Sequence, residues 1–587
     1  MSTSEPLSRA VVTGRPTPPA VGAAALIAAL LRPAERRWSA LIVLAALCGM
    51  MFFYGLDVGE LYRTESLRAI IGRGFLESGN WLVPTLYGQP LLTKPPGMYA
   101  AIAAASWPFG EVTEWTARLP SALAATAVVF LFYWYAGRQL GRLGGLVAAA
   151  VTPCTFLWLE KASAAEIDML QVAWVSAALV FFFRATEGES PPRRAWGWWL
   201  AALLCVAGGG LTKWTAGVFF YAAAVPFLLW RRQLRLLVSP QHLLAALAGA
   251  GICLAWVAAV VQQVGWETFW SSVWAEALPR LSHKHHLGDN QLLESLAHPF
   301  KLLLVNLPWS GFALLTLTPG FLACWDERGR RLVQAFHCWA WPNIFVWSVL
   351  PDHATRHSFP LFPGITGLAA LVWFAYLSGR LPQRWARLHT MYTLLALGLF
   401  GVLALAGGIS GVVLLPANVW WLVLLVMMMA LWCVQAGWRA HQAGRLGGLL
   451  ASVVLTWLVL KVTMVNLYVP MRNAAREPRA KAAVLARTVP PGQPLYIFKV
   501  KNEGIMFYYG RPVVRLKDWD QLPLGSEPVY LVVDGQEWQE VQRRSDWRRT
   551  VEVHLRDEQG DPMVLLGVTR GEVPILQARA AGHLPHQ

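Results

Sequence analysis

The chain has 587 residues, of which 56% are hydrophobic and only 14% charged, and its mean hydropathy is +0.42. This composition is too apolar for a soluble enzyme, and many windows exceed the roughly 18 apolar residues that indicate a membrane span. The formal net charge of +16 does not indicate nucleic acid here, because the cations lie mostly in short loops between apolar segments, where they report membrane orientation.

Thirteen apolar segments predict a polytopic α-helical membrane protein. Residues 1–37 precede them and form a predicted basic cytoplasmic tail. Every predicted inner loop then carries arginine, as the positive-inside rule requires, and an odd number of spans places the C-terminus outside. The predicted spans are 38–55, 116–137, 143–160, 168–184, 196–211, 215–230, 242–261, 300–323, 331–350, 359–379, 389–409, 419–436 and 446–468.

The alternation of inner and outer loops also decides whether residues 97–111 cross the membrane. The segment is apolar but short for a crossing, and counting it as a span would reverse every later arginine-rich loop. We therefore expect it to be a juxtamembrane helix within a first outer loop, residues 56–115, of a membrane domain that covers residues 38–470.

Composition changes after about residue 470, where charges rise and apolar runs shorten to strand length. Residues 471–587 predict a small extracytoplasmic α/β domain. Its predicted strands are 494–500, 512–516, 528–535, 549–555 and 562–568, and its predicted helices lie near 473–488 and 536–544.

The first outer loop holds the most distinctive charges of the chain. Its acids are Asp57, Glu60, Glu65 and Glu77, and its cations are Arg63, Arg68, Arg73 and Lys94. Lys94 stands directly before Pro95-Pro96, which holds it on a stiff, extended segment suited to meeting an anion such as a phosphate. The alternative is a proline-terminated loop with a solvated lysine.

Further ionisable residues fall on the same predicted face. Asp168 opens the fourth span and Lys213 ends the fifth, while the 262–299 loop contains Arg280 and three histidines, 283, 285 and 286. Arg356 and His357 precede the tenth span. Each has an ordinary alternative: Asp168 caps a helix, Lys213 snorkels, and the histidines lie near lipid headgroups and bind no metal. No metal site is predicted, although a divalent metal is left open.

A site at the outer leaflet cannot draw on cytoplasmic nucleotides, and no nucleotide-binding motif appears. A sugar transferred there typically arrives on a polyprenyl phosphate. The acceptor then attacks C1 of the sugar while the lipid phosphate leaves. A carboxylate can take the acceptor proton, and Lys94, Lys213 and Arg356 can stabilise the charge on the phosphate.

The motif GFLESGNWLVPTLYGQPLLTKPPGMY resembles the first outer loop of GT-C glycosyltransferases, in the group of the protein O-mannosyltransferases and lipid A aminoarabinose transferases. TARLPSALAAT (116–126), IDML (167–170), LTK (211–213), PWS (308–310) and RHSFPLFP (356–363) resemble later signatures of that group in the same order. The resemblance covers roughly residues 38–380 and implies the GT-C fold.

The resemblance also implies roles. Lys94 would contact the donor phosphate, and Asp168 and Arg356 match an acid and an arginine of the group. The acidic Asp-Glu pair of that group corresponds to Thr64-Glu65 in this chain, so the first of the two acids is missing here. Glu65 is then the leading catalytic carboxylate, with Asp57, Glu60 or Asp168 as alternatives. Thr93 replaces a glutamate that some members carry, which puts a metal ligand there in doubt.

We therefore predict an inverting glycosyltransferase of a bacterial inner membrane, with a polyprenyl-phosphate sugar as donor. Lipid A or another glycolipid is the favoured acceptor, and a serine or threonine side chain is the alternative. A lipid-linked sugar transporter is the reading from another class, but acids at the outer ends of spans are less typical of transporters than acids at the midplane.

Overall fold

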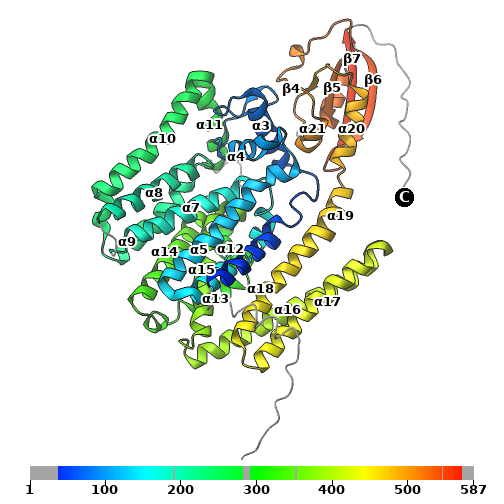
Figure 1. Ribbon diagram of the computed structural model, residues 1–587. Helices are drawn as coiled ribbons and strands as arrows, with labels where there is room; N and C mark the ends of the chain where they lie inside the picture. Colours follow the sequence, from blue (N-terminus) through cyan, green and yellow to red (C-terminus); the bar gives the residue numbers. More distant parts are fainter. Residues whose placement is uncertain are drawn as a thin grey trace, which may run out of the picture.

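The computed structural model describes residues 37–188, 192–281, 291–350, 353–500, 502–544 and 547–570. A body of packed helices carries a small sheet domain at one end, as Figure 1 shows. Residues 1–36 of the tail predicted at 1–37, the three histidines and the end of the chain from 571 lie outside the described residues.

Fourteen helices of the described residues overlap the thirteen predicted spans, because α5 extends over the second span and into the third, and the third and eighth spans are each divided between two helices. They are α2 (Arg37–Cys48), α5 (Glu114–Val151), α6 (Phe156–Lys161), α7 (Ile167–Ala185), α8 (Pro192–Gly210), α9 (Ala216–Trp230), α10 (Pro240–Val264), α12 (Gln291–Val305), α13 (Trp309–Leu315), α14 (Glu327–Val349), α15 (Phe362–Leu377), α16 (Gln383–Leu414), α17 (Trp420–Gln442) and α18 (Leu446–Thr463). Gly141 interrupts α5 between the second and third predicted spans. Its φ of +77° is not helical, and glycine adopts this conformation more readily than other residues.

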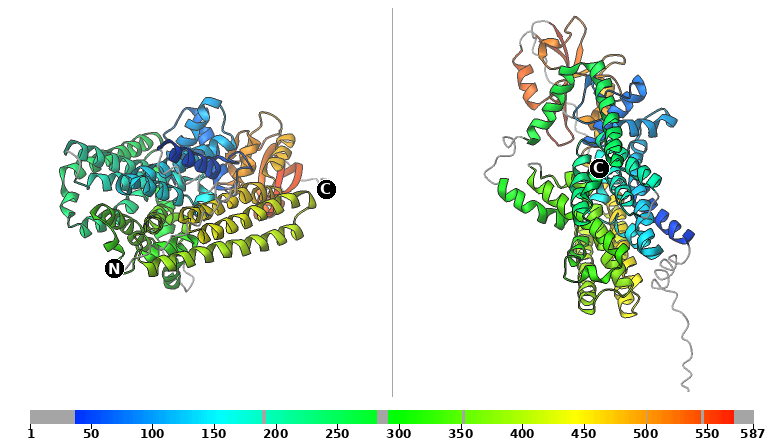
Figure 2. Two further views of the ribbon diagram at one scale, coloured as in Figure 1. Left: turned by 60° about the horizontal axis from the view of Figure 1, so that its bottom comes forward. Right: turned by 90° about the vertical axis from the view of Figure 1, so that its left-hand side faces the viewer.

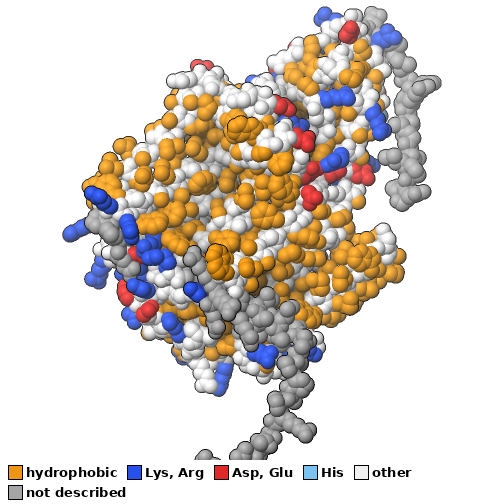
Figure 3. All heavy atoms as spheres, viewed as in Figure 1, with side chains coloured by type: hydrophobic (Ala, Val, Ile, Leu, Met, Phe, Trp, Pro, Cys, Tyr) orange, Lys and Arg blue, Asp and Glu red, His pale blue; other side chains and the backbone are white. Residues whose placement is uncertain are grey.

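Seven helical stretches in the described residues are both long and apolar enough to cross a membrane, and the shorter helices at Trp38–Phe53 and Ala216–Trp230 are also apolar. The multi-pass membrane fold is thereby confirmed, while the number thirteen stays a prediction. Figure 3 shows apolar side chains over much of the helical body, with basic side chains at the end away from the sheet domain. Arg232 and Arg235, between α9 and α10, are exposed cations of the chain's loops.

The first outer loop folds into short elements on top of the helical body. They are α3 (Thr64–Ser78), the hairpin of β1 (Thr85–Leu86) and β2 (Gln89–Pro90), and the expected short helix, α4 (Gly97–Ser106). α11 (Trp266–Leu281) lies near them after α10. α3 packs against α4 through Phe75 and Tyr99, whose rings meet edge to face at 6.4 Å.

The sheet domain has the strand order β4-β3-β5-β7-β6. β3 (Leu495–Ile497) runs parallel to β4 (Val513–Arg515) and to β5 (Val529–Asp534), whereas β6 (Trp547–Arg556) and β7 (Pro562–Arg570) extend the sheet antiparallel. The helices are α19 (Val469–Ala474), α20 (Pro478–Thr488), α21 (Glu503–Tyr509) and α22 (Gly535–Gln542). The five strands, α20 and α22 match the predicted elements, and α21 was not predicted.

One shared core joins the sheet domain to the first outer loop. Ile71 and Phe75 of α3 are buried in the same cluster as Ile505 of α21 and Leu565 of β7. Burial of apolar surface at about 25 cal/mol per Å² stabilises this contact, so the domain is fixed on the loop that carries the predicted catalytic acids. The views in Figure 2 place the sheet domain beyond one end of the helical body.

Candidate active site

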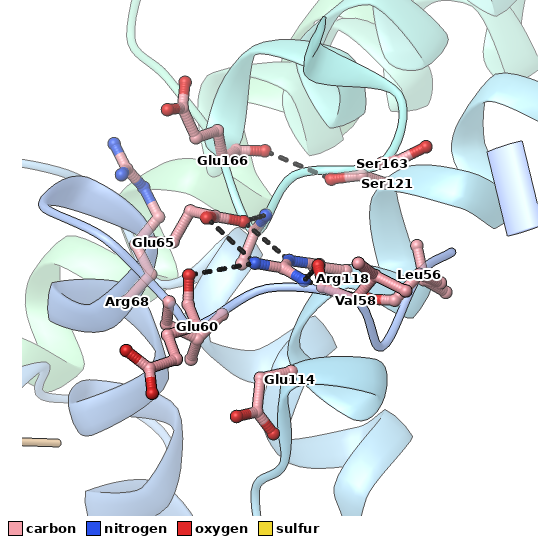
Figure 4. Close-up of polar contacts among 12 residues, drawn as sticks. Leu56, Val58, Glu60, Glu65, Arg68, Glu114, Arg118, Ser121, Ser163 and Glu166 are labelled. Carbon is pink, nitrogen blue, oxygen red and sulfur yellow. Dashed lines mark hydrogen bonds and ion pairs between the residues drawn. The ribbon is translucent and has the colours of Figure 1, made fainter. Parts of the chain in front are cut away.

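Glu65 is the centre of a buried ion pair. Arg118 of α5 donates from Nε to Oε1 of Glu65 at 2.9 Å and from Nη2 to Oε2 at 3.3 Å, and both side chains are buried. The remaining guanidinium hydrogens reach the carbonyl oxygens of Leu56, Val58 and Glu60, as Figure 4 shows. Arg118 therefore ties the start of the first outer loop to α3.

A third donor completes the surroundings of this carboxylate. The backbone N–H of Ala165 donates to Oε1 of Glu65 at 2.9 Å. Burial by itself raises the pKa of Glu65, but the charge and hydrogen bonds of Arg118, together with the Ala165 N–H, outweigh it and hold the pKa below its ordinary value. A carboxylate held this firmly in its ionised form is a weak proton acceptor and a strong structural anchor.

A cavity of about 400 Å³ opens beside this pair. It lies between the predicted first outer loop, the segment between α6 and α7, and the C-terminal end of α18. Three acids and seven basic side chains line it, namely Glu65, Glu160, Glu166, Arg63, Arg118, Lys161, Arg356, Lys461, Arg472 and Arg476. The excess of cations favours an anionic ligand, and a phosphate group fits both the charge and the donors.

Two π-helical turns lie at helix ends beside this cavity, which is lined by Gly55, just after the first turn, and by Met464, Val465 and Tyr468 of the second. One, Gly49–Phe53, continues α2, and the other, Met464–Tyr468, continues α18. Gly55 has φ +69° and lies so close to Val465 that any Cβ on it would overlap that side chain. This close approach, which only glycine permits, brings the C-terminal ends of the two helices together at the cavity.

Glu166 and Glu160 are the two cavity carboxylates that were not among the predicted site residues, and Glu166 is the more sheltered of them. The hydroxyl of Thr64 donates to its Oε1 at 3.1 Å, and Lys161 pairs with its Oε2 at 2.9 Å. Its side chain is 12% exposed, so it is sheltered yet reaches the cavity. The segment that carries it follows α6 and is held by Ser163, whose hydroxyl donates to the carbonyl of Phe52. A signal was present in the acidic run EKASAAEID, but its spacing does not specify which acid faces α3.

A second set of charges forms next to the cavity. Lys213 and Asp168 make a buried pair at 2.9 Å. The backbone N–H of Gly97 donates to the carbonyl of Leu211 at 2.8 Å, so the segment after Lys94 lies directly against the one that carries Lys213. His357 acts electrostatically on Asp168. Three predicted phosphate ligands thus fall into two groups, with Arg356 on the cavity and Lys213 beside the Lys94 segment.

The remaining predicted residues have varied surroundings. Lys94 is half-buried and is not among the residues that line the cavity, and its ammonium donates to the carbonyl of Thr93 at 3.4 Å. Asp57 is exposed and also lies off the cavity. Glu60 pairs with Arg479 at 3.6 Å, and burial raises its pKa despite that partner. Arg63 is exposed and lines the cavity.

Arg280 belongs to α11, but its side chain lies outside what the structure describes. Within the described ranges, no group of three or more His, Cys, Asp or Glu side chains is placed to hold a metal ion. Metal dependence is therefore as open as the sequence left it.

Comparison with solved structures defines the class of the protein. Crystal structures of ArnT from Cupriavidus metallidurans match the chain with a TM-score of 0.69 when bound to undecaprenyl phosphate and 0.67 in the apo state, at 18% and 17% identity. The first match covers 89% of this chain and 97% of the other. The fold is the GT-C fold, as predicted.

Within that class, the sequence is similar to the predicted group. Residues 93–262 match the family model of dolichyl-phosphate-mannose-protein mannosyltransferase. Undecaprenyl phosphate-alpha-4-amino-4-deoxy-L-arabinose arabinosyl transferases from Erwinia tasmaniensis and Pseudomonas aeruginosa are 27% and 28% identical, over 55% and 52% of this chain. The matched segments span 57% and 54% of those relatives, little more than half of their length. The predicted resemblance is thereby confirmed.

Proposed function

We propose that the chain is an inverting glycosyltransferase that moves a sugar from a polyprenyl phosphate to an envelope acceptor at the outer face of the inner membrane. The observation that supports this most directly is the cavity beside Glu65, in which cations outnumber acids and a sheltered carboxylate, Glu166, stands among them. A donor phosphate needs cationic partners, and the transfer needs a carboxylate within reach of the acceptor. The similarity to arabinosyl transferases that carry undecaprenyl phosphate in their names supports the same donor class.

An apolar groove provides for the lipid part of the donor. It has a volume of about 690 Å³ and lies between α2, α5 and α18, with lining residues from Leu446 to Leu458 on α18. Lys461, one turn beyond Leu458, already lines the charged cavity. By helix rise, the path from Leu446 to Lys461 is about 22 Å long. That is deeper than half of the roughly 30 Å hydrocarbon core, and therefore suits a long isoprenoid chain.

Glu166 is the general base of this proposal. The acceptor hydroxyl gives its proton to the Glu166 carboxylate while its oxygen attacks C1 of the sugar from the face opposite the phosphate. The bond between C1 and the phosphate oxygen breaks, and the phosphate leaves with the electron pair. A base of this kind contributes about 10²–10⁴ in rate. Arg356 and the other cavity cations stabilise the charge that grows on the leaving phosphate.

Glu65 has the structural role in this mechanism. Its oxygens already accept from Arg118 and from the Ala165 N–H, and its depressed pKa makes it a poor base. Thr64, which stands where the resembling group has its first acid, instead holds Glu166 by a hydrogen bond. The missing carboxylate is thus supplied in space by a residue far away in sequence.

The acceptor is proposed to be lipid A or another glycolipid, in a bacterial inner membrane with the N-terminus cytoplasmic and the sheet domain extracytoplasmic. Exposed arginines at the end of the body away from the sheet domain support this orientation. Serine and threonine side chains of proteins are the second acceptor class, and the family model for protein mannosyltransferase over residues 93–262 supports it.

The proposal is tested by reconstituting the full chain with a radiolabelled sugar on undecaprenyl phosphate and an extract of envelope lipids and proteins. We expect label in the glycolipid fraction, at the mass of one added sugar by mass spectrometry. Label in the protein fraction alone would select the alternative acceptor. Release of free lipid-linked sugar across the vesicle membrane without any transfer would contradict the enzyme and favour a transporter.

A further inference from the structure

A second cavity lies outside the membrane body, between the sheet domain and the first outer loop. Its volume is about 550 Å³. One side consists of the β1–β2 hairpin and α11, and the other consists of residues that follow the strands of the sheet. It shares no lining residue with the cavity at Glu65, so the mechanism above does not use it.

The position of this cleft in the sheet domain is that of a ligand site. β4, β3 and β5 are parallel, and their carboxyl ends therefore meet at one edge. Phe498 and Lys499 come directly after β3, Lys517 follows β4, and Glu540 belongs to α22, which begins directly after β5. Open α/β sheets bind ligands in the crevice outside the carboxyl ends of their parallel strands.

The chemistry of the lining suits a sugar with an anionic substituent. Trp519, whose ring packs on the buried ring of Phe498 at 4.1 Å, offers apolar surface to a sugar ring. Lys499 and Lys517 are exposed cations of the cleft, and with Arg515 they outnumber its two acids, Glu537 and Glu540. The hydroxyl-bearing residues of α11 that face them are Thr268, Ser271 and Ser272, spaced by three and four residues on one side of the helix.

Contacts between the two walls hold the cleft in shape. The backbone N–H of Arg515, the last residue of β4, donates to the carbonyl of Tyr87 in the hairpin at 3.4 Å, and its guanidinium lies 5.1 Å from the Tyr87 ring centre. Trp519 donates from its indole nitrogen to Glu540 at 2.9 Å, which fixes the orientation of its ring. A ligand in the cleft therefore contacts the sheet domain and the first outer loop at once.

We propose that this cleft is a subsite for an anionic saccharide, the phosphorylated head group of the glycolipid acceptor. The identification of this saccharide as the acceptor rests on the proposed function. The binding of a phosphorylated saccharide in the cleft is independent of it. The sheet domain then selects the acceptor, while the cavity at Glu65 and Glu166 carries out the transfer. Because the hairpin and α3 belong to one loop, an acceptor held in the cleft is placed on the loop that also lines the reaction site.

The test uses the full chain in lipid nanodiscs and a deacylated glucosamine disaccharide, with and without phosphates, as the probe in titration calorimetry. The variant Lys499→Glu/Lys517→Glu reverses two exposed charges of the cleft. Its control, Arg548→Glu/Arg556→Glu, reverses two exposed charges on β6, at the far edge of the same sheet. Neither pair touches the reaction cavity, and neither residue pair is buried.

We expect the cleft variant to bind the phosphorylated disaccharide at least about tenfold more weakly, through lost charge-assisted contacts, while the control binds normally. In transfer assays, the KM for the acceptor rises similarly and kcat changes less than twofold. Equal binding by all three proteins, or equal affinity for the unphosphorylated probe, overturns the subsite. Charge-dependent binding in a chain that transfers no sugar would keep the subsite and overturn the proposed function instead.

Discussion

The Thr64 hydroxyl donates a hydrogen bond of 3.1 Å to the carboxylate of Glu166, which lies 102 residues further along the chain. Thr64 stands at the position where the resembling group carries an acid. The hydrogen bond fixes the replacement carboxylate over that position, and Lys161 holds its other oxygen. The negative charge that the local sequence lacks is therefore present in the folded protein.

The first prediction concerns Glu166 itself. Replacement Glu166→Gln keeps the shape and the contact with Thr64 but removes the proton acceptor, so kcat should fall by about 10²–10⁴ with little change in the donor KM. Initial rates of sugar transfer in nanodiscs measure this. The matched control is Glu160→Gln, which also pairs with Lys161 but is 57% exposed, and which should retain near-normal activity. Full activity of Glu166→Gln would leave the reaction without its assigned base.

The second prediction concerns the stability of the ion pair between Glu65 and Arg118. Removal of either partner leaves an uncompensated buried charge, which costs about 3–5 kcal/mol, so Glu65→Ala and Arg118→Ala should each lower the thermal midpoint strongly. The double variant should lose much less than the sum of the two. Thermal denaturation in detergent measures all three proteins.

The exposed pair of Arg231 and Glu327 provides the control for that cycle. The two side chains lie 2.8 Å apart, and Glu327 is 69% exposed. Glu327→Ala should therefore change stability by no more than about 1 kcal/mol. Additive effects at Glu65 and Arg118 would mean that the pair is not coupled.

The third prediction follows from the depressed pKa of Glu65. A carboxyl group with a lower pKa in the folded than in the unfolded protein stabilises the fold fully above its unfolded pKa of about 4.3. That contribution is lost as the pH falls through the folded value, because the folded protein must then take up the proton. The stability advantage of the natural chain over the double alanine variant should be constant from pH 8 to 5 and shrink below about pH 4. An advantage that grew on acidification would contradict the assigned direction.

The sequence predicted the helical body and the sheet well because both depend on local patterns. Apolar runs located the helices, and strand-length runs located β3 to β7. The membrane orientation deduced from the arginine-bearing loops stays a prediction. Helix α21 was missed because its seven residues resemble a strand-length run.

The site was predicted only in part. Glu65, Arg63 and Arg356 do line one cavity, but Glu166 and Arg118 gain their roles through contacts across 102 and 53 residues, which spacing does not reveal. Arg118 belongs to TARLPSALAAT, which was quoted only as a signature of the resembling group, and the sequence assigned no role to its charge. Lys94 does not line this cavity, and Gly97, three residues after it, bonds to Leu211. Its contact with the donor phosphate stays a prediction.

The fourth prediction separates Arg356 from the buried pair of Lys213 and Asp168. Arg356 is exposed and lines the cavity, so Arg356→Ala should raise the donor KM about tenfold or more without lowering the thermal midpoint. Lys213→Ala should mainly lower the midpoint, since it leaves Asp168 buried without its partner. Measuring KM and the midpoint for both variants distinguishes them. The reverse pattern would assign the phosphate to Lys213.

The fifth prediction concerns Lys94 and the segment that carries it. Lys94→Ala removes the ammonium and should reduce transfer, with a raised donor KM and a normal thermal midpoint, if the lysine meets the phosphate as predicted. Gly97→Ala tests the position of the segment. A Cβ there would lie 2.6 Å from the Thr212 hydroxyl oxygen and force the start of α4 away from Leu211.

Gly97→Ala should therefore reduce transfer although it leaves every charge in place. Gly74→Ala is the control for the replacement of a helical glycine in the same loop, since a Cβ there would meet only the Thr85 hydroxyl, at an ordinary 3.7 Å. The sugar-transfer rates and thermal midpoints of the three variants together show whether the Lys94 segment acts at the donor site. Normal transfer by both Lys94→Ala and Gly97→Ala would remove the lysine from the donor site and leave the phosphate to the cations around Glu166.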